Sequence, residues 1–194
     1  NPYAEGLEFM KDIFYSIVNK KVLKIDYLKF NSNKLTIYDK FHPHYLKQFN
    51  KRWYLFGCSD GYDSVTTIPL DRIKSLVEVN HLYKPSEIDF QNEYFDDVVG
   101  VTVNQDKPLI DVRLKVDKEQ WLRMRTQPVH HSQKHRKKLS ESEDNSMIVD
   151  FRLKLNKEFV NYLFQWSEYI TVLQPDELAD RIKSKAEKVL NRYK

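Results

Sequence analysis

Apolar residues recur at helical spacing between Leu7 and Val18, and they change to a strand-like pattern from Val22 onward. The first pattern predicts an amphipathic helix over residues 5–19. The second predicts short strands, because turn-forming sequences such as Asp60-Gly61 interrupt it. One helix followed by several strands at hairpin spacing indicates a small β-barrel.

The strands predicted for this first half are short, and one of them runs into a proline. Pro43 should bend or interrupt its strand, because proline has no N–H to donate to a sheet. A tight turn is expected at Asn50-Lys51. The strands and extended segments that we expect are 22–30, 35–41 with a continuation over 45–49, 52–59, 64–69 and 71–79.

The second half has a different order of patterns. A connector with a short helix over Asn92–Val98 comes first. Strands and helices then alternate as β-α-β-β-α-β-α, which is the order of a ferredoxin-like split βαβ unit with a closing helix. The expected elements are Leu109–Val116, Asp117–Met124, Val129–Leu139, Met147–Leu155, Asn156–Trp166, Tyr169–Leu173 and Pro175–Tyr193.

Three segments of the first half stand in a characteristic order. They are His42-Pro43-His44-Tyr45-Leu46, Arg52-Trp53-Tyr54-Leu55-Phe56-Gly57 and Leu70-Asp71-Arg72-Ile73. Together they resemble the WYL domain, the sensor module of many bacterial transcriptional regulators. Near the C-terminus, Val172-Leu173-Gln174-Pro175 is similar to the element that opens the last helix of the extension often found after WYL domains.

The resemblance covers nearly the whole chain and implies an α+β protein of two folded parts. We expect a linker helix over residues 1–20 and an Sm/SH3-like β-barrel, the WYL domain, over 21–82. A connector over 83–107 then leads to a ferredoxin-like βαββαβ extension over 108–194.

The composition of the chain bears on where the protein is located in the cell. Cys58 is the single cysteine, so no internal disulfide can form and a reducing, cytoplasmic location is expected. No apolar run approaches the roughly 20 residues that cross a bilayer, so we expect no membrane partner. The chain begins at Asn1 and not at Met, which suggests a piece of a longer protein.

The predicted ligand site of the barrel centres on Tyr54, Arg72 and His44. Strand alternation sends Trp53 and Leu55 to one face and Tyr54 to the other. The Arg72 guanidinium could bind a phosphate or carboxylate, which is the role that the resemblance implies; the alternative is an internal pair with an acid such as Asp26. Lys47 and Arg52 are expected to supply positive charge at the rim of this site, and Tyr27 is expected as a core or rim residue beside it.

Two features argue against a fully developed anion site and against a metal. Many WYL domains carry an arginine a few positions before Arg72, whereas this chain has Thr66-Thr67-Ile68 there. His42 and His44 share a strand face and could bind metal, but no third ligand is evident, so a hydrogen-bonding role is preferred. We therefore expect neither a metal nor a cofactor.

A basic stripe lies between Trp121 and Leu139, a stretch without any acid. Such a stripe can bind phosphate backbones, but lysines also protect solvated edge strands, and the sequence leaves both interpretations open. The candidate nucleic-acid contacts are Arg123, Arg125, Lys134, Arg136, Lys137 and Lys138.

The motifs of common enzymes do not occur in the sequence, and glycine is too sparse for most phosphate-binding loops, so we do not expect an enzyme. The resemblance implies the sensing and dimerising region of a transcriptional regulator, with an anionic effector such as a nucleotide or single-stranded nucleic acid. Duplex DNA would be bound by a domain that this chain lacks. The alternative is a module that binds nucleic acid directly through the basic stripe.

Overall fold

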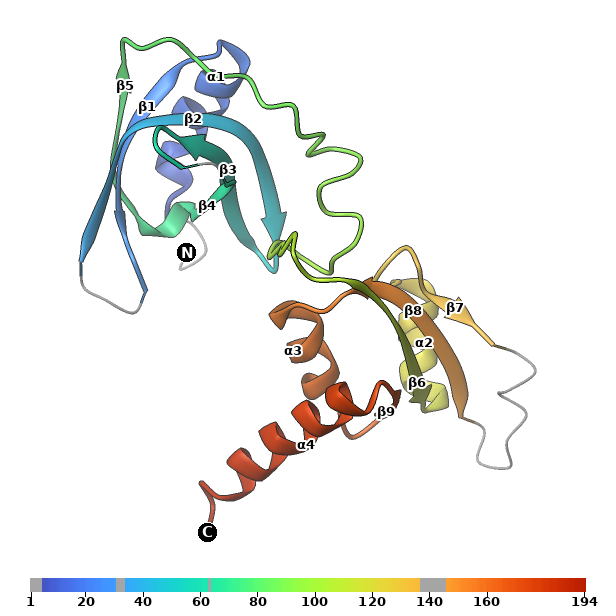
Figure 1. Cartoon of the computed structure of the whole chain (residues 1–194). Helices are drawn as coiled ribbons and strands as arrows, with labels where there is room; N and C mark the ends of the chain where they lie inside the picture. Colours follow the sequence, from blue (N-terminus) through green and yellow to red (C-terminus); the bar gives the residue numbers. More distant parts are fainter. Residues whose placement is uncertain (1–4, 31–33, 63, 137–145) are drawn as a thin grey trace. The chain divides into compact units, whose positions relative to one another are not determined.

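A computed structural model describes residues 5–30, 34–62, 64–136 and 146–194 of the 194-residue chain. The chain divides into two compact units, Asn1–Phe90 and Gln91–Lys194, each built around its own antiparallel sheet (Figure 1). Among the described residues, no helix is long and apolar enough to cross a membrane.

The first unit contains one helix and an open sheet with the strand order β4-β3-β2-β1-β5. No pairing joins β4 to β5 in the described part, so the sheet is not the closed barrel predicted from the sequence. β4 has only four residues and passes directly into a 3-10 turn, which leaves it little length for a second ladder. The elements are η1 Leu7–Phe9, α1 Met10–Val18, β1 Val22–Leu28, β2 Leu35–Phe49, β3 Arg52–Ser59, β4 Thr66–Pro69, η2 Leu70–Arg72 and β5 Ile73–Val79.

β2 is a single 15-residue strand that curves through the unit (Figure 1). Its first half pairs with β1 and its second half with β3, and a register shift lies between Pro43 and Tyr45. Pro43 therefore bends the strand, as expected, without interrupting it. Asn50 and Lys51 both have positive φ, 48° and 64°, and form the tight turn expected between β2 and β3.

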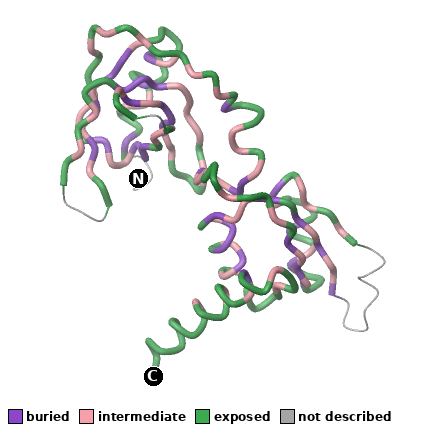
Figure 2. Tube along the Cα trace, in the orientation of Figure 1, coloured by how far each residue is buried: buried purple, intermediate pink, exposed green. Residues whose placement is uncertain are grey.

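The core of the first unit forms where α1 packs against the inner face of the sheet (Figure 2). Ile13 of α1 is fully buried, and full burial of such a side chain contributes about 1.5–3 kcal/mol. The buried cluster consists of Ile13, Leu23, Ile25, Tyr27, Phe41, Leu55, Ile68, Leu70 and Ile73.

The second unit has the element order predicted from the sequence, and its strand order is β7-β8-β6-β9. Buried residues on one face of β6 and β8 pack against the helices, as in the contact between Phe151 and Phe159, whose ring centroids are 5.5 Å apart. The elements are β6 Leu109–Val116, α2 Lys118–Thr126, β7 Lys134–His135, β8 Met147–Lys154, α3 Lys157–Gln165, β9 Ile170–Gln174 and α4 Asp176–Leu190.

Two predicted elements of this unit are wrong in the described residues. The helix expected over Asn92–Val98 is a series of turns. The long strand expected from Val129 is reduced to Lys134–His135. The reason lies in Gln133, whose amide donates to the Met124 carbonyl (2.9 Å) and accepts from the Val129 N–H (3.1 Å), so the chain turns before it can extend.

Candidate functional site

Tyr54 lies on the outer face of the first sheet, opposite the core. Leu55 beside it is fully buried, and Trp53 packs partly against the same core. Tyr54 is half-buried and is the cross-strand partner of Lys47, so both side chains belong to one face. Among the described residues the Tyr54 hydroxyl has no hydrogen-bond partner, which leaves it available to a ligand.

Arg72 is a half-buried cation without an acidic partner in the described part of the chain. Its guanidinium carbon lies 4.6 Å from the centroid of the exposed Phe30 ring. The internal pair with Asp26 that the sequence left open is absent: Asp26 Oδ2 accepts instead from the Ser75 hydroxyl at 2.7 Å. Arg72 therefore keeps its hydrogen-bond donors for another anion.

Tyr27 takes the core place that the sequence left open beside the rim, and Arg52, a predicted rim cation, has an acidic partner. Tyr27 is only 8% exposed and belongs to the core cluster. Arg52 binds Asp71 through Nη2 at 2.9 Å, beside a separate pocket of about 310 Å³. Of the six residues predicted for the ligand site, Lys47 and Tyr54 are direct cross-strand partners.

His42 and His44 hold a segment of the chain that follows β5. We call this segment, residues 80–90, the strap. The Lys84 N–H donates to His42 Nδ1 (3.1 Å), and His44 Nε2 donates to the Lys84 carbonyl (2.9 Å). Both polar backbone atoms of one residue are thus satisfied by two histidines spaced two apart on β2. Tyr83 adds a hydrogen bond from its hydroxyl to the Pro43 carbonyl at 2.8 Å, and burial raises its pKa to about 12.

Asp60 contacts three basic side chains around the strap. Its carboxylate lies 2.7 Å from Lys84 Nζ, 3.2 Å from His42 Nε2 and 3.2 Å from His81 Nε2. The hydrogen bond from Lys84, followed by that from His42, holds the pKa of Asp60 well below its usual range. Asp60 therefore stays ionised and ties the strap to the end of β3.

His42, Asp60 and His81 are close enough to be considered as metal ligands, since their ligand atoms lie within 4.8 Å of one another. The hydrogen bonds oppose this role. His42 Nδ1 accepts from a backbone N–H, so the proton of the neutral ring is on Nε2 and no lone pair faces the cluster. Lys84 Nζ also occupies Asp60 Oδ1, so a metal would have to break both contacts.

His44, which the sequence favoured as a ligand contact, is half-buried, and its ring packs against residues of the strap. Its ring centroid lies 5.7 Å from that of Tyr83 and 6.1 Å from that of Phe90, and burial lowers its pKa. His42, which the sequence placed second, is completely buried and has the larger set of partners. Nothing in the sequence indicates this difference, because the partners come from residues 60 and 80–84.

The described members of the predicted basic stripe do not form one surface. Arg123 on α2 lies 5.2 Å from the Trp166 ring, on the helical side of the unit, while Arg125 is exposed at the end of α2. In β7, His135 turns toward Trp121, with ring centroids 4.7 Å apart. The flanking Lys134 and Arg136 belong to the opposite face. Lys137 and Lys138 lie outside the described residues.

Asp150 partly neutralises the cations on that opposite face. Arg113 donates to it from Nε (2.8 Å) and Nη2 (3.1 Å), and Arg136 donates from Nε (2.7 Å). These bonds, chiefly that of Arg113, lower the pKa of Asp150. The pocket around them has a volume of about 590 Å³ and also contains Lys134 and Arg152.

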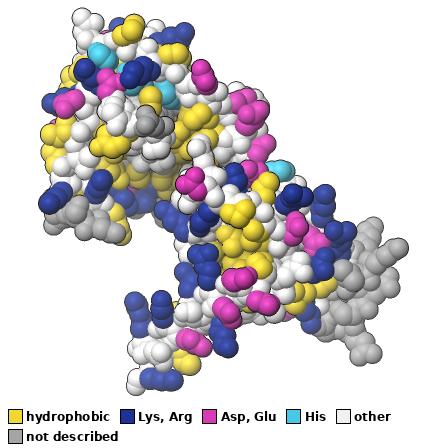
Figure 3. Space-filling view, in the orientation of Figure 1, with side chains coloured by type: hydrophobic (Ala, Val, Ile, Leu, Met, Phe, Trp, Pro, Cys, Tyr) yellow, Lys and Arg dark blue, Asp and Glu magenta, His cyan; other side chains and the backbone are white. Residues whose placement is uncertain are grey.

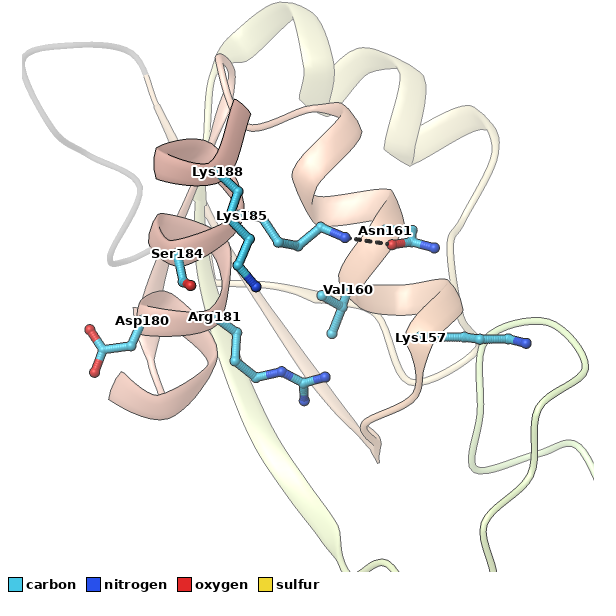
Figure 4. A pocket seen from close by; sticks show the side chains of 8 residues that line it. All are labelled: Lys157, Val160, Asn161, Asp180, Arg181, Ser184, Lys185 and Lys188. Carbon is cyan, nitrogen blue, oxygen red and sulfur yellow. Dashed lines mark hydrogen bonds between the residues drawn. The ribbon is translucent and has the colours of Figure 1, made fainter. Parts of the chain in front are cut away.

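A further group of cations, not singled out from the sequence, lies between α3 and α4 (Figure 4). The sequence could have predicted part of this group, because Arg181, Lys185 and Lys188 are spaced four and then three residues apart, as on one face of a helix. Lys157 completes the group from the start of α3.

Comparisons with known proteins identify both halves of the chain. The family model of the WYL domain matches residues 8–78, and that of the WCX domain matches residues 108–190. No curated protein matches the sequence.

Two solved structures are similar over most of the chain. One is the crystal structure of a CRISPR Cas-related protein (TM-score 0.51, 10% identity, 98% of this chain and 52% of that one). The other is proteasome accessory factor B/C (PafBC) of Arthrobacter aurescens (TM-score 0.41, 15% identity, 89% of this chain and 25% of that one). The chain thus spans about half of the first structure and a quarter of the second. At 10% identity, the likeness to the first structure speaks for the fold alone. The two domain matches carry the assignment: the chain contains a WYL domain, followed by a WCX domain.

Proposed function

We propose that this chain is the effector-sensing and dimerising region of a bacterial transcriptional regulator, and that its WYL domain binds an anionic ligand. The observation that carries the proposal is Arg72, a half-buried guanidinium with no acidic partner among the described residues. Such a cation gains most from an anion that it can bind with two parallel hydrogen bonds.

The ligand that fits best is a nucleotide or a short single-stranded nucleic acid. Arg72 would bind a phosphate, and Tyr54 offers a hydroxyl and an aromatic ring beside the Lys47 ammonium. Thr66 and Thr67 supply hydroxyls where other WYL domains often carry an arginine. Because His44 and Arg52 already have partners within the domain, we assign them the secondary task of shaping the site.

Ligand binding would act on gene expression through the rest of the regulator. In a homodimer, the effector would bias the placement of DNA-reading helices that belong to a domain outside this chain, and it would do so in the cytoplasm, where the DNA is. We do not propose catalysis. Burial raises the pKa of the Cys58 thiol, which works against its use as a nucleophile.

We also propose a finer description of the fold. The strongly bent β2, shared by β1 and β3, supports an open form of an Sm-like barrel for the WYL domain. In the WCX domain, the strand order β7-β8-β6-β9 with helices after β6 and β8 supports a ferredoxin-like unit.

The test is fluorescence anisotropy with labelled single-stranded DNA, RNA and nucleotides at two salt concentrations. Arg72→Ala should abolish binding of the nucleotides and lower the affinity for the single-stranded oligonucleotides, whereas the double variant Arg125→Ala/Lys134→Ala should leave both unchanged. The opposite pattern would favour the alternative, direct binding of nucleic acid through the basic stripe. Absence of binding to any of these probes would contradict the anionic ligand proposed for Arg72.

A further inference from the structure

The WCX domain has a pocket of about 430 Å³ between α3 and α4. It is lined by Lys157, Val160 and Asn161 from α3 and by Asp180, Arg181, Ser184, Lys185 and Lys188 from α4. Figure 4 shows the Arg181 and Lys188 side chains extending into the space beside α3, while Asp180 points away from them. We call this pocket the α3–α4 groove.

The cations of the groove are not neutralised by the protein. Among the described residues, Lys157, Arg181 and Lys188 form no ion pair and no hydrogen bond. Lys185 donates to Asn161 Oδ1 at 3.0 Å, a neutral partner that leaves its charge uncompensated, and its Nζ lies 5.1 Å from the Phe164 ring centroid. Four cations and one acid therefore line the groove.

Three cations of α4 share one face of the helix. At about 100° per residue, Arg181, Lys185 and Lys188 fall within an arc of roughly 60°. Asp176, Asp180 and Glu187 fall on another arc together with Lys183, and Glu177 borders the cationic arc; Figure 3 shows both dark-blue and magenta side chains along α4. Like charges four residues apart, as in Arg181 and Lys185, cost a few tenths of a kcal/mol in a helix.

The lining favours phosphate over an acidic peptide. Val160 is the one apolar side chain among the lining residues and is only 4% exposed, so the groove offers no pocket for the apolar anchors that dominate protein interfaces. Arg181 and Lys188 are about 10 Å apart along the helix axis. That length equals roughly three phosphate spacings of one nucleic-acid strand in a duplex.

We propose that the α3–α4 groove binds consecutive phosphates of a nucleic-acid strand, as a site separate from Arg72 and independent of the function proposed for the WYL domain. Lys157, Arg181 and Lys188 would each contact the sugar–phosphate backbone, so binding would depend little on base sequence. This surface does not include the basic stripe of residues 123–138.

The experiment measures the affinity of the full chain for labelled single-stranded and duplex 12-mers between 50 and 200 mM salt. The Arg72→Ala background removes any contribution of the WYL site. Three phosphate contacts predict a slope of log K against log salt of about −2 for a single strand and about −3 for a duplex. Arg181→Glu/Lys188→Glu should lower the affinity at least tenfold and flatten the slope.

The matched control is Lys118→Glu/Lys183→Glu, which changes the net charge by the same amount on α2 and on the other side of α4. It should retain most of the affinity, and thermal unfolding should show that both double variants are folded. An equal loss in the control, no binding in the Arg72→Ala background, or tighter binding of poly-glutamate than of either oligonucleotide would overturn the proposal. None of these outcomes depends on whether Arg72 binds an effector.

Discussion

The polar cluster around the strap and the α3–α4 groove both gather polar and charged side chains but use them differently. In the WYL domain, His42, Asp60 and Lys84 all bond to one another or to nearby backbone. In the groove, Arg181 and Lys188 have no such partner within the described residues. Groups of the first kind should affect stability when they are changed, and groups of the second kind should affect binding. The comparison shows that the partners of a polar residue, more than its type, indicate its role.

The largest expected effect concerns the backbone beneath the strap cluster. A Cβ on Gly57 would lie 2.2 Å from the His42 carbonyl oxygen and 2.6 Å from the Phe41 ring. Because β2 and β3 are paired at this point, neither neighbour can easily move. We expect Gly57→Ala to lower the free energy of unfolding by about 3 kcal/mol or more, measured by urea denaturation.

Gly61→Ala is the matched control for this prediction. Gly61 has φ +84°, and no atom lies within 4 Å of the point that a Cβ would occupy, so only backbone strain of roughly 1 kcal/mol is expected. Similar losses in the two variants would mean that close contact at Gly57 is not what limits that position.

His42 should give the next largest effect. His42→Leu removes the acceptor of the Lys84 N–H and a partner of Asp60 from a fully buried position, for an expected loss of about 2–3 kcal/mol. His42→Asn keeps an acceptor near the place of Nδ1 and should recover part of this loss. Unfolding monitored by tryptophan fluorescence distinguishes the two. Equal stability of the Leu variant and the wild type would show that the strap is held by other contacts.

Asp150→Asn would remove the carboxylate that two cations share. Arg113 and Arg136 would lose their charged partner, at an expected cost of about 1 kcal/mol, since all three side chains are partly exposed. The same change should raise the affinity of the second unit for a phosphorylated probe, measured by isothermal calorimetry. A loss of stability without any gain in anion binding would break the distinction between engaged and free cations.

The pH dependence of stability should show a smaller effect. Burial lowers the pKa of His44, so the unfolded chain takes up a proton that the folded chain resists. Stability contributed by neutral His44 is therefore complete above the ordinary pKa of 6.5 and is lost as the pH falls below it. Asp60 adds nothing to this window, because its lowered pKa keeps it ionised throughout.

His44→Gln keeps a donor for the Lys84 carbonyl but cannot titrate. Melting temperatures measured between pH 8 and pH 5 should fall less steeply in this variant than in the wild type. Some slope should remain, since burial also lowers the pKa of His130. An unchanged slope would rule out His44 as a contributor.

The smallest expected effect is that of Arg181→Ala on stability. Arg181 is exposed and lacks a partner among the described residues, so the free energy of unfolding should stay within about 0.5 kcal/mol of the wild type. Chemical denaturation checks this value. A larger loss would mean that the groove is part of the packing of α4 against α3.

Element order was predictable from the sequence because periodicity depends on local residues. The change at Val22 from helical to strand-like spacing and the turn at Asn50-Lys51 both appear in the structure. The predictions of a closed barrel and of a long strand from Val129 were wrong. Closure of the barrel depends on pairing between distant strands, and the strand is cut short by the Gln133 hydrogen bonds.

Site residues were predictable where one strand decides the outcome. Tyr54 lies opposite the buried Leu55 because neighbours in a strand alternate. The roles of His42 and His44 could not be derived, since their partners come from a segment some 40 residues away. The cations of α4 could have been found by placing its residues on a helical projection, whereas their closeness to Lys157 required the packing of α4 against α3.

Cys58 gives the chain a built-in chemical reporter. It is the single cysteine and lies opposite His42 in the β2–β3 ladder. Burial raises the pKa of its thiol, and the charges of Lys84 and Asp60 also act on that pKa. Alkylating reagents attack the thiolate, so modification should be slow while the strap is closed and should accelerate whenever it opens. The rate of Cys58 labelling would therefore follow strap opening in the unmodified protein, without any introduced probe.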